Sequence, residues 1–207
     1  MSVPFSVVSL ADLDTDSIAE RVMALRDRWE LRSDEYSFYT LGKNAYLEGD
    51  TPAYEEQYKE LNTLLVETFP DLYITLVNYL AMNLGQPVRL ADNLAFPGFH
   101  IFEADDSFEN IAGNWHYDYP QKTLGLEGKD NSTVTVAIKL PKSGAGIDWI
   151  DTEGKPQYLA YQEKDVIWHN GLTLHRIAGF KEIVKGEYRI TMQGHLIRRA
   201  NGFELYW

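Results

Sequence analysis

The order of apolar and polar positions predicts helices in the first part of the chain. Between residues 15 and 31, apolar side chains recur at the spacing of one helical face, and Ser17 with Glu20 fits a capping box. Pro52 marks the start of a second helix, because proline is favoured in the first helical turn. We therefore expect two amphipathic helices before residue 69.

A third helix is expected over residues 69–84, ending at Gly85. It has so few polar positions that we expect it to be buried against a sheet. The stretch 32–50, between the first two helices, is rich in tyrosine and phenylalanine but has no clean period. It is either a lid or binding loop, or a loop held to the core by its aromatic side chains.

Beyond residue 87 the pattern changes to short β-prone segments with turns between them. The expected strands are Val88–Phe96, Phe99–Ala104, a strand through His116, Thr133–Ile138, Ile147–Ile150, Tyr158–Tyr161, Val166–Trp168, Leu174–Phe180 and Tyr188–Arg198. Many short strands of this kind favour an antiparallel barrel or a double-sheet jelly roll. The predicted fold class is α+β and mainly β. A helical layer of residues 1–86 is expected to pack on a β-core of residues 87–207, in a single domain, 1–207.

Composition narrows the classes of function. The chain has 207 residues and no cysteine, which excludes disulfides, thiolate metal sites and cysteine nucleophiles. A net charge of −12 repels phosphate backbones, so we expect no nucleic-acid partner. The chain has no apolar run long enough to span a bilayer and no visible signal peptide, so we expect no membrane partner and a cytoplasmic location. The pattern gives no indication of the oligomeric state.

The candidate chemistry begins with the pair His116 and Asp118. In an extended strand, residues two apart point to the same face, so an imidazole nitrogen and a carboxylate oxygen could converge on one metal ion. They would supply two of the three ligands of a two-His, one-carboxylate site, the site of non-haem Fe(II) oxygenases. A His-x-Asp pair is also common by chance, and the alternative is a surface strand whose two side chains face solvent. A third ligand elsewhere in the sequence is needed to decide between a metal site and a surface strand.

Two later residues complete a known pattern. His175 follows His116 by 59 residues, and Arg189 follows His175 by 14. Together with His116-Tyr117-Asp118 they resemble the Fe(II)/2-oxoglutarate-dependent dioxygenases, over about residues 95–200. The Trp-His-x-Asp sequence that begins at Trp115 is similar to the one in phytanoyl-CoA-hydroxylase-like members.

The resemblance implies a double-stranded β-helix that holds iron through His116, Asp118 and His175. It further implies that Arg189 pairs with the distal carboxylate of 2-oxoglutarate through a bidentate fork. Thr191, where the family more often has serine, could add a hydroxyl to that carboxylate. The implied cofactors are Fe(II), 2-oxoglutarate and O2. The implied activity is hydroxylation of an unactivated C–H bond in a small molecule, an amino acid derivative or a peptide, with succinate and CO2 as co-products.

Other residues compete for roles in this site. His169 is an alternative ligand, but the turn signal at Asn170 breaks the strand between it and His175, and the resemblance favours His175. His100 could line the cosubstrate pocket or be a structural histidine, and His195 is expected to be a packed or partly exposed sheet residue. The candidate substrate-facing walls are Tyr117, Tyr119 and Trp149, together with the aromatic loop at 36–46.

Two other functions remain open from the residues. A cupin-type enzyme that does not use 2-oxoglutarate would also bind metal through histidine and acidic residues. It would not need a carboxylate anchor at Arg189, which separates it from the oxygenase. A non-catalytic ligand-binding jelly roll with a vestigial metal site is the third possibility. Lys164-Asp165 stands where the dioxygenase family usually has Gly-Asp, a departure that affects a turn.

Overall fold

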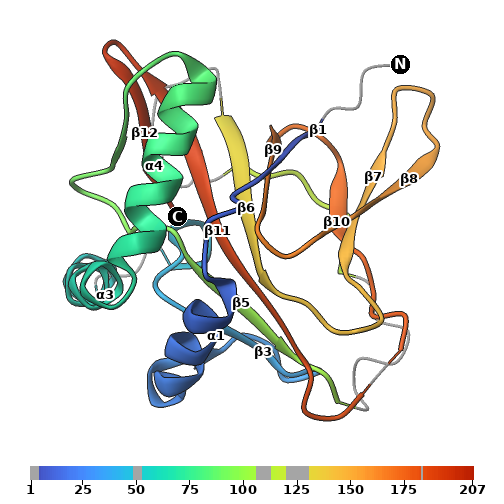
Figure 1. The fold of residues 1–207 in the computed structure, drawn as a ribbon. Helices are drawn as coiled ribbons and strands as arrows, with labels where there is room; N and C mark the ends of the chain where they lie inside the picture. The colour runs from blue at the N-terminus through green and yellow to red at the C-terminus, as the bar shows by residue number, and fades with distance from the viewer. Residues whose placement is uncertain (1–4, 49–52, 106–112, 120–130, 183) are drawn as a thin grey trace.

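The computed structural model describes residues 5–48, 53–105, 113–119, 131–182 and 184–207 (Figure 1). Its helices are α1 Thr15–Ala24, the 3₁₀ helix η1 Arg26–Arg28, α2 Ala45–Glu48, α3 Tyr54–Thr68 and α4 Pro70–Leu84. Its strands are β1 Phe5–Ser9, β2 Glu30–Leu31, β3 Phe38–Leu41, β4 Val88–Leu90, β5 Gly98–Glu103, β6 Asn131–Lys139, β7 Gly146–Ile150, β8 Pro156–Ala160, β9 Asp165–Asn170, β10 His175–Ile177, β11 Tyr188–Arg199 and β12 Gly202–Tyr206. The expectation of a mainly β protein is confirmed.

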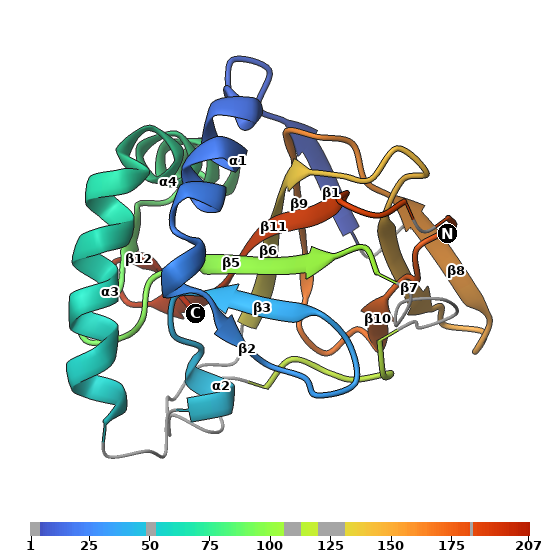
Figure 2. The same cartoon turned by 90° about the horizontal axis from the view of Figure 1, so that it is seen from below.

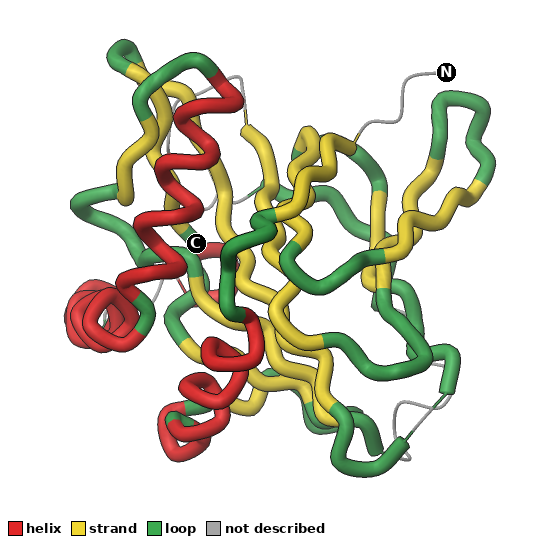
Figure 3. The backbone as a smooth tube through the Cα atoms, in the orientation of Figure 1, coloured by secondary structure: helices red, strands yellow, loops and turns green. Residues whose placement is uncertain are grey.

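The strands of the described residues form two sheets. The larger has the order β1-β9-β6-β11-β5-β3-β2, and β12 pairs with both β11 and β4. The smaller has the order β10-β7-β8. All pairs are antiparallel except β12 with β4. Figure 2 shows helices α1, α3 and α4 on one side of the large sheet and the small sheet on the other, and the tube in Figure 3 traces the same layers.

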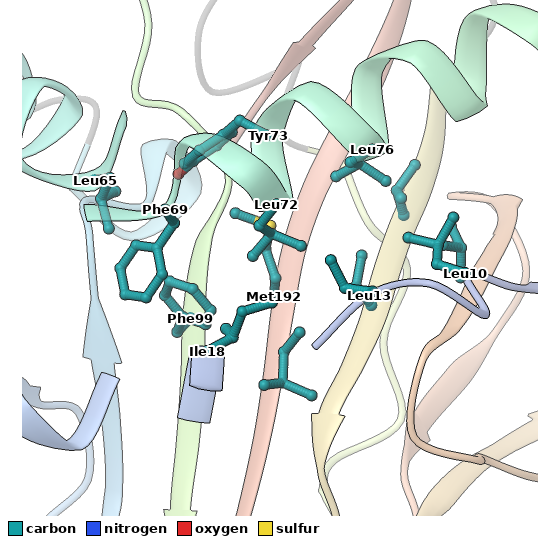
Figure 4. Close-up of a cluster of buried hydrophobic side chains, with 14 of the residues drawn as sticks. Leu10, Leu13, Ile18, Leu65, Phe69, Leu72, Tyr73, Leu76, Phe99 and Met192 are labelled. Carbon is teal, nitrogen blue, oxygen red and sulfur yellow. The ribbon is translucent and has the colours of Figure 1, made fainter. Parts of the chain in front are cut away.

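One face of the large sheet carries the main apolar core. Successive residues of a strand point to opposite faces, so every second side chain of β5, β6 and β11 reaches the helices. Figure 4 shows Leu72 and Phe69 of the helical side over Phe99 and Met192 of the sheet. The rings of Phe69 and Phe99 lie 4.8 Å apart. The buried residues of this core come from both the helices and the strands.

Helix α1 is shorter than the sequence suggested and is capped differently. Asp14, not Ser17, is the N-cap, and its side chain accepts a hydrogen bond from the Ser17 backbone N–H at 3.0 Å. The helix ends at Ala24, and η1 and β2 follow where the helical period had been extended to residue 31. A helical spacing of apolar residues therefore continued past the last helical turn, because those side chains reach the same core from other backbone geometry.

Helix α4 ends as predicted at Gly85, which adopts φ +61° in the left-handed region that glycine tolerates. Its burial was overestimated. Ile74 and Met82 are exposed, while Leu72, Leu76 and Leu80 face the sheet. Its apolar side chains are spread around the axis, but only one side meets the sheet. The predicted start of the preceding helix at Pro52 lies outside the described residues, and α3 begins at Tyr54.

Residues 1–86 are not purely helical, because β1, β2 and β3 belong to the large sheet. The irregular stretch 32–50 contains β3 and α2. Strand β3 pairs with β5, and the ring of Phe38 stacks on Phe102 at 4.4 Å. The aromatic residues of this stretch lacked a visible period because the strand is only four residues long.

Several predicted strands differ from the observed ones. Only Val88–Leu90 of the segment 88–96 is a strand, and β12 had not been predicted. His116 lies in a single β-bridge to His175 rather than in a strand. Lys164, in the place of the usual glycine, has φ +77°, the region that glycine occupies most easily. None of the helices within the described residues has the length and apolarity needed to cross a bilayer.

Candidate metal centre and its cavity

Among the described residues, His116, Asp118 and His175 form a group whose ligand atoms all lie within 4.8 Å of one another. The Nε2 atom of His175 is 3.4 Å from Asp118 Oδ2, and that of His116 is 3.7 Å from Asp118 Oδ1. Paired backbone hydrogen bonds between His116 and His175, of 2.9 and 3.0 Å, bring the two segments together. The side chain of His116 is 45% exposed, whereas that of Asp118 is 5% exposed. The group therefore lies at a boundary between interior and solvent.

Both histidines of the group have one ring nitrogen fixed by the backbone. His116 Nδ1 lies 2.7 Å from the Asn114 carbonyl oxygen, and His175 Nδ1 lies 2.7 Å from that of Thr173. A carbonyl oxygen only accepts hydrogen bonds, so each Nδ1 carries the proton and donates. Each Nε2 then presents a lone pair toward Asp118, which is the tautomer that a metal ligand requires.

Asp118 is held from several sides. Thr133 Oγ1 donates to its Oδ2 at 2.5 Å, and Asn131 Nδ2 donates to its carbonyl oxygen at 3.1 Å. Its backbone N–H donates to the Gly171 carbonyl oxygen at 2.9 Å. Burial opposes ionisation, but the nearby histidine rings and the Thr133 hydroxyl leave the pKa of Asp118 below its ordinary value. The residues present thus offer two imidazole nitrogens and one carboxylate, a donor set that fits Fe(II).

A cavity of about 290 Å³ opens beside this group, between the two sheets. Its described lining residues are Tyr36, Phe38, His100, Phe102, Gly113, Asn114, His116, Thr133, Thr135, Ile147, Tyr161, His169, His175, Ile177, Ala178, Phe180, Arg189, Thr191 and Gln193. Those from β5, β6 and β11 are the side chains that alternate with the core-facing ones. The cavity is therefore the second face of the large sheet, and its volume is near the lower end of ligand sites.

Arg189 is a buried cation in this cavity and is only 3% exposed. Among the described residues, its Nε and Nη1 atoms have no hydrogen-bond partner, and Nη2 has a long contact of 3.5 Å to the Gly146 carbonyl oxygen. The guanidinium carbon lies 5.5 Å from the ring centres of both Phe102 and Tyr161. Burial lowers the pKa of Arg189 and raises that of Tyr161 to about 12. A guanidinium fork between two rings, with no carboxylate paired to it in the described parts of the chain, fits an incoming carboxylate.

Thr191 lies two residues beyond Arg189 on the same face of β11, and both side chains line the cavity. Directly across from Thr191, on β5, is His100. One strand pair therefore presents a guanidinium, a hydroxyl and an imidazole to the same space.

The other two histidines have distinct surroundings. His169 lines the cavity with its ring 4.6 Å from that of His175, but it is not part of the ligand group. Burial lowers its pKa to about 4. His195 is fully buried, as expected for a packed sheet residue, and its Nδ1 lies 3.4 Å from Thr133 Oγ1. His195 therefore contacts the threonine whose hydroxyl donates a hydrogen bond to Asp118.

The three proposed substrate walls do not line the cavity. Tyr117 is 48% exposed and Tyr119 is 46% exposed, with their rings 6.0 Å apart. Trp149 lies opposite His175 on β7, and its ring meets Phe5 edge-on at 5.6 Å. Tyr36 and Phe38 of the aromatic loop 36–46 do line the cavity. The other aromatic lining residues, Phe102, Tyr161 and Phe180, had not been proposed.

The signal that could have found some of these walls is the period of two along the strands. Arg189, Thr191 and Gln193 share one face of β11, and His100 and Phe102 share one face of β5. If Arg189 faces the cavity, the period of two places Thr191 and Gln193 on the cavity side of β11 as well. Tyr36 and Phe180 lie outside the strands, where no period applies.

Comparison with known proteins supports the fold. No protein-family model matches the sequence, and a search of the curated proteins gave no match. An oxidoreductase of the 2OG-Fe(II) oxygenase family from Burkholderia pseudomallei is similar with a TM-score of 0.57 and 14% identity, over 97% of this chain and 87% of that chain. An N-substituted L-amino acid dioxygenase from Burkholderia ambifaria AMMD gives 0.53 and 14%, over 80% and 73%. A non-heme alpha-ketoglutarate-dependent carbocyclase, SnoK from nogalamycin biosynthesis, gives 0.53 and 10%, over 99% and 92%. The chain has the fold of these enzymes, in agreement with the predicted jelly roll.

Proposed function

We propose that the protein is an Fe(II)- and 2-oxoglutarate-dependent oxygenase. The observation that carries this proposal is one cavity with two complementary ends. One end has two imidazoles and a carboxylate whose ligand atoms lie within 4.8 Å of one another. The other has a buried guanidinium with two unpartnered nitrogens. A metal ion and a carboxylate are the groups that these two ends would bind.

His116, Asp118 and His175 would hold the iron. The backbone carbonyls at Asn114 and Thr173 keep the proton on each Nδ1, so that both Nε2 atoms are available without a proton transfer. The hydroxyl of Thr133 keeps the Asp118 carboxylate oriented. Iron with 2-oxoglutarate and O2 would supply the oxidation of a C–H bond to an alcohol, releasing succinate and CO2.

Arg189 would bind the carboxylate of 2-oxoglutarate that is remote from the metal, and Thr191 would add a hydroxyl. The buried position of Arg189 makes this interaction strong, because a desolvated cation without a partner is unfavourable until an anion arrives. The rings of Phe102 and Tyr161, each centred 5.5 Å from the guanidinium carbon, restrict the movement of the fork. This anchor is what favours the oxygenase over a metal-dependent enzyme that does not use 2-oxoglutarate.

The substrate would be a small molecule, an amino acid derivative or a peptide with an unactivated C–H bond. One protein of similar fold acts on N-substituted L-amino acids, as its name states, and another is a carbocyclase. Hydroxylation, the activity that the sequence resemblance implies, is the first reaction to test. The Trp-His-x-Asp sequence at Trp115 supports a phytanoyl-CoA-hydroxylase-like subtype within the superfamily.

The proposal is tested by succinate formation from 2-oxoglutarate with Fe(II) and O2, which wild-type protein should catalyse even without its substrate at a slow rate. His175→Ala removes a ligand and should lower this rate more than about 100-fold, beyond the 10- to 100-fold effect of losing an outer partner. Arg189→Met should keep iron binding but weaken 2-oxoglutarate binding about 30-fold or more.

A matched control is Asp92→Ala, which removes an exposed carboxylate paired with Arg89 at 3.3 Å, remote from the cavity. Its succinate rate should equal that of the wild type. Undiminished succinate formation by His175→Ala would contradict the assignment of the metal site. Normal 2-oxoglutarate affinity in Arg189→Met would point instead to the cupin-type alternative.

A further inference from the structure

His100 presents an unused hydrogen-bonding group to the cavity. The residue is only 5% exposed and lines the cavity, and its Nε2 atom has no hydrogen-bond partner within the part of the chain that the structure describes. A buried polar atom without a partner is unfavourable, and native proteins rarely retain one unless a ligand, an ion or water satisfies it. The Nε2 atom of His100 is such an atom, and it faces a cavity that a ligand could occupy.

The ring of His100 is held in place by aromatic neighbours. Phe38 meets it edge-on with ring centres 5.1 Å apart, and Trp207 packs on it at 5.2 Å. These apolar contacts leave its polar edge unengaged and restrict its rotation. A ring that is fixed before binding loses little conformational entropy when a ligand arrives.

The position of His100 relates it to the carboxylate end of the cavity. It is the direct cross-strand neighbour of Thr191, and its own neighbour Phe102 on the same face is paired with Arg189. Cross-strand partners have side chains close together on one face of a sheet. The imidazole therefore belongs to the same end of the cavity as the guanidinium and the Thr191 hydroxyl.

The charge state of the ring suits a donor beside a cation. Burial, helped by the nearby Arg189, lowers the pKa of His100 to about 3, so the imidazole is neutral at physiological pH. A neutral imidazole does not repel the guanidinium and can still donate one N–H. A carboxylate oxygen accepts from both groups at once, whereas an amide or hydroxyl ligand would leave the guanidinium without a counter-charge.

We propose that His100 is a binding residue for the remote carboxylate of the diacid, donating a hydrogen bond from Nε2 to the carboxylate that Arg189 pairs with. The inference rests on the proposed function, because it assumes that the cavity binds 2-oxoglutarate. It adds a third contact from β5 to the two that β11 supplies. His100 thereby favours a five-carbon diacid over a 2-oxo acid with an apolar tail.

The test compares two ligands on two variants. Calorimetry on Fe(II)-loaded protein without O2 measures binding with no turnover, using 2-oxoglutarate and 2-oxopentanoate, which lacks the remote carboxylate. His100→Leu should weaken 2-oxoglutarate binding about 10- to 100-fold, the effect of a hydrogen bond to a charged group. Binding of 2-oxopentanoate should change less than about twofold. His100→Gln, whose amide retains an N–H donor, should recover part of the lost affinity.

A second measurement does not depend on the variants being equally stable. In Zn²⁺-loaded wild-type protein labelled at its histidine nitrogens, 2-oxoglutarate should shift one buried imidazole N–H that is missing in His100→Gln. Equal loss of affinity for both ligands, unchanged affinity for 2-oxoglutarate in His100→Leu, or an unmoved imidazole signal would each overturn the role of His100. If wild-type protein fails to bind 2-oxoglutarate at all, the proposed function falls and this inference falls with it.

Discussion

The two faces of the large sheet are built from the same strands but carry different kinds of side chain. Toward the helices, Phe99, Ile190 and Met192 pack in the main apolar core. Toward the small sheet, the residues that alternate with them include His100 and Arg189, which carry buried nitrogen atoms without a hydrogen-bond partner among the described residues. Both faces are buried. The difference is that the helical face is filled by apolar side chains of the protein, whereas the cavity face keeps hydrogen-bonding atoms without a partner among the described residues.

The comparison separates residues that stabilise the fold from residues that prepare a site. Burying unpaired polar groups is unfavourable, and proteins retain such groups where a ligand will complete them. On the helical face, the contribution of a side chain depends on its shape and apolar area. On the cavity face it depends on hydrogen-bonding groups and charge. Substitutions on opposite faces of one strand should therefore affect different measurements.

The largest effect on stability is expected at Phe99, on the helical face of β5. Phe99→Ala should lower the free energy of unfolding by about 3–5 kcal/mol, because it leaves a cavity beneath Phe69 in the main core. Phe102→Ala, three residues along and on the cavity face, should cost less, because one side of its ring already borders empty space. Urea unfolding of both variants measures the difference. Equal losses would mean that the two faces are packed alike.

A smaller effect, on metal binding, is expected from the cavity face of β6. Thr133→Val removes the hydroxyl that orients Asp118 and should weaken Fe(II) binding about 10- to 100-fold. Thr135→Val, two residues along on the same face, also loses a hydroxyl of the cavity wall and should bind the metal normally. Metal titration by calorimetry compares them. If both variants weakened binding alike, the hydroxyl bond to Asp118 would have no special role.

The smallest effect is a pH dependence that originates on the cavity face. Burial lowers the pKa of His100 to about 3 and that of His195 to about 4, against an ordinary value of about 6.5. Between about pH 6.5 and pH 4 the unfolded chain binds protons at these residues and the native protein does not, so stability falls as the pH falls. Each histidine contributes up to about 1.4 kcal/mol per pH unit in that window.

This dependence can be assigned by substitution. In metal-free protein, His100→Gln should reduce the slope of unfolding free energy against pH by about one proton, which urea unfolding at pH 7, 6 and 5 would detect. An unchanged slope would show that His100 is already protonated, or is exposed, in the native protein.

Much of the architecture could be predicted from local patterns. The alternation of residues 133–138 indicated a strand, and Gly85 indicated the end of α4, because both signals depend only on neighbours in the sequence. Such alternation is typical of a strand with one face in water, but both faces of β6 are buried. A polar face that lines a cavity inside the protein looks the same in sequence as a polar face in water.

Other features depended on partners remote in sequence. β1 and β3 were missed because a short strand is defined by the strand it pairs with, here β9 and β5. His116 was expected in a strand, but a single bridge to His175 holds it. The walls proposed at Tyr117 and Tyr119 rested on nearness in sequence to His116. The backbone turns those rings outward, and the cavity is closed by aromatic residues from other segments.

The sequence by itself determined which chemical groups are available: two histidines and an aspartate in a recognisable order, an arginine after them, and a period of two that places Arg189 and Thr191 on one side of a strand. Only the tertiary structure decided which of these groups are left without partners inside the protein. Whether a polar atom has a hydrogen-bond partner depends on all the residues that pack around it. The surroundings of His100 come from the three strands β3, β5 and β11 and from Trp207. That is why His100 was ambiguous in the sequence and is a candidate ligand contact in the fold.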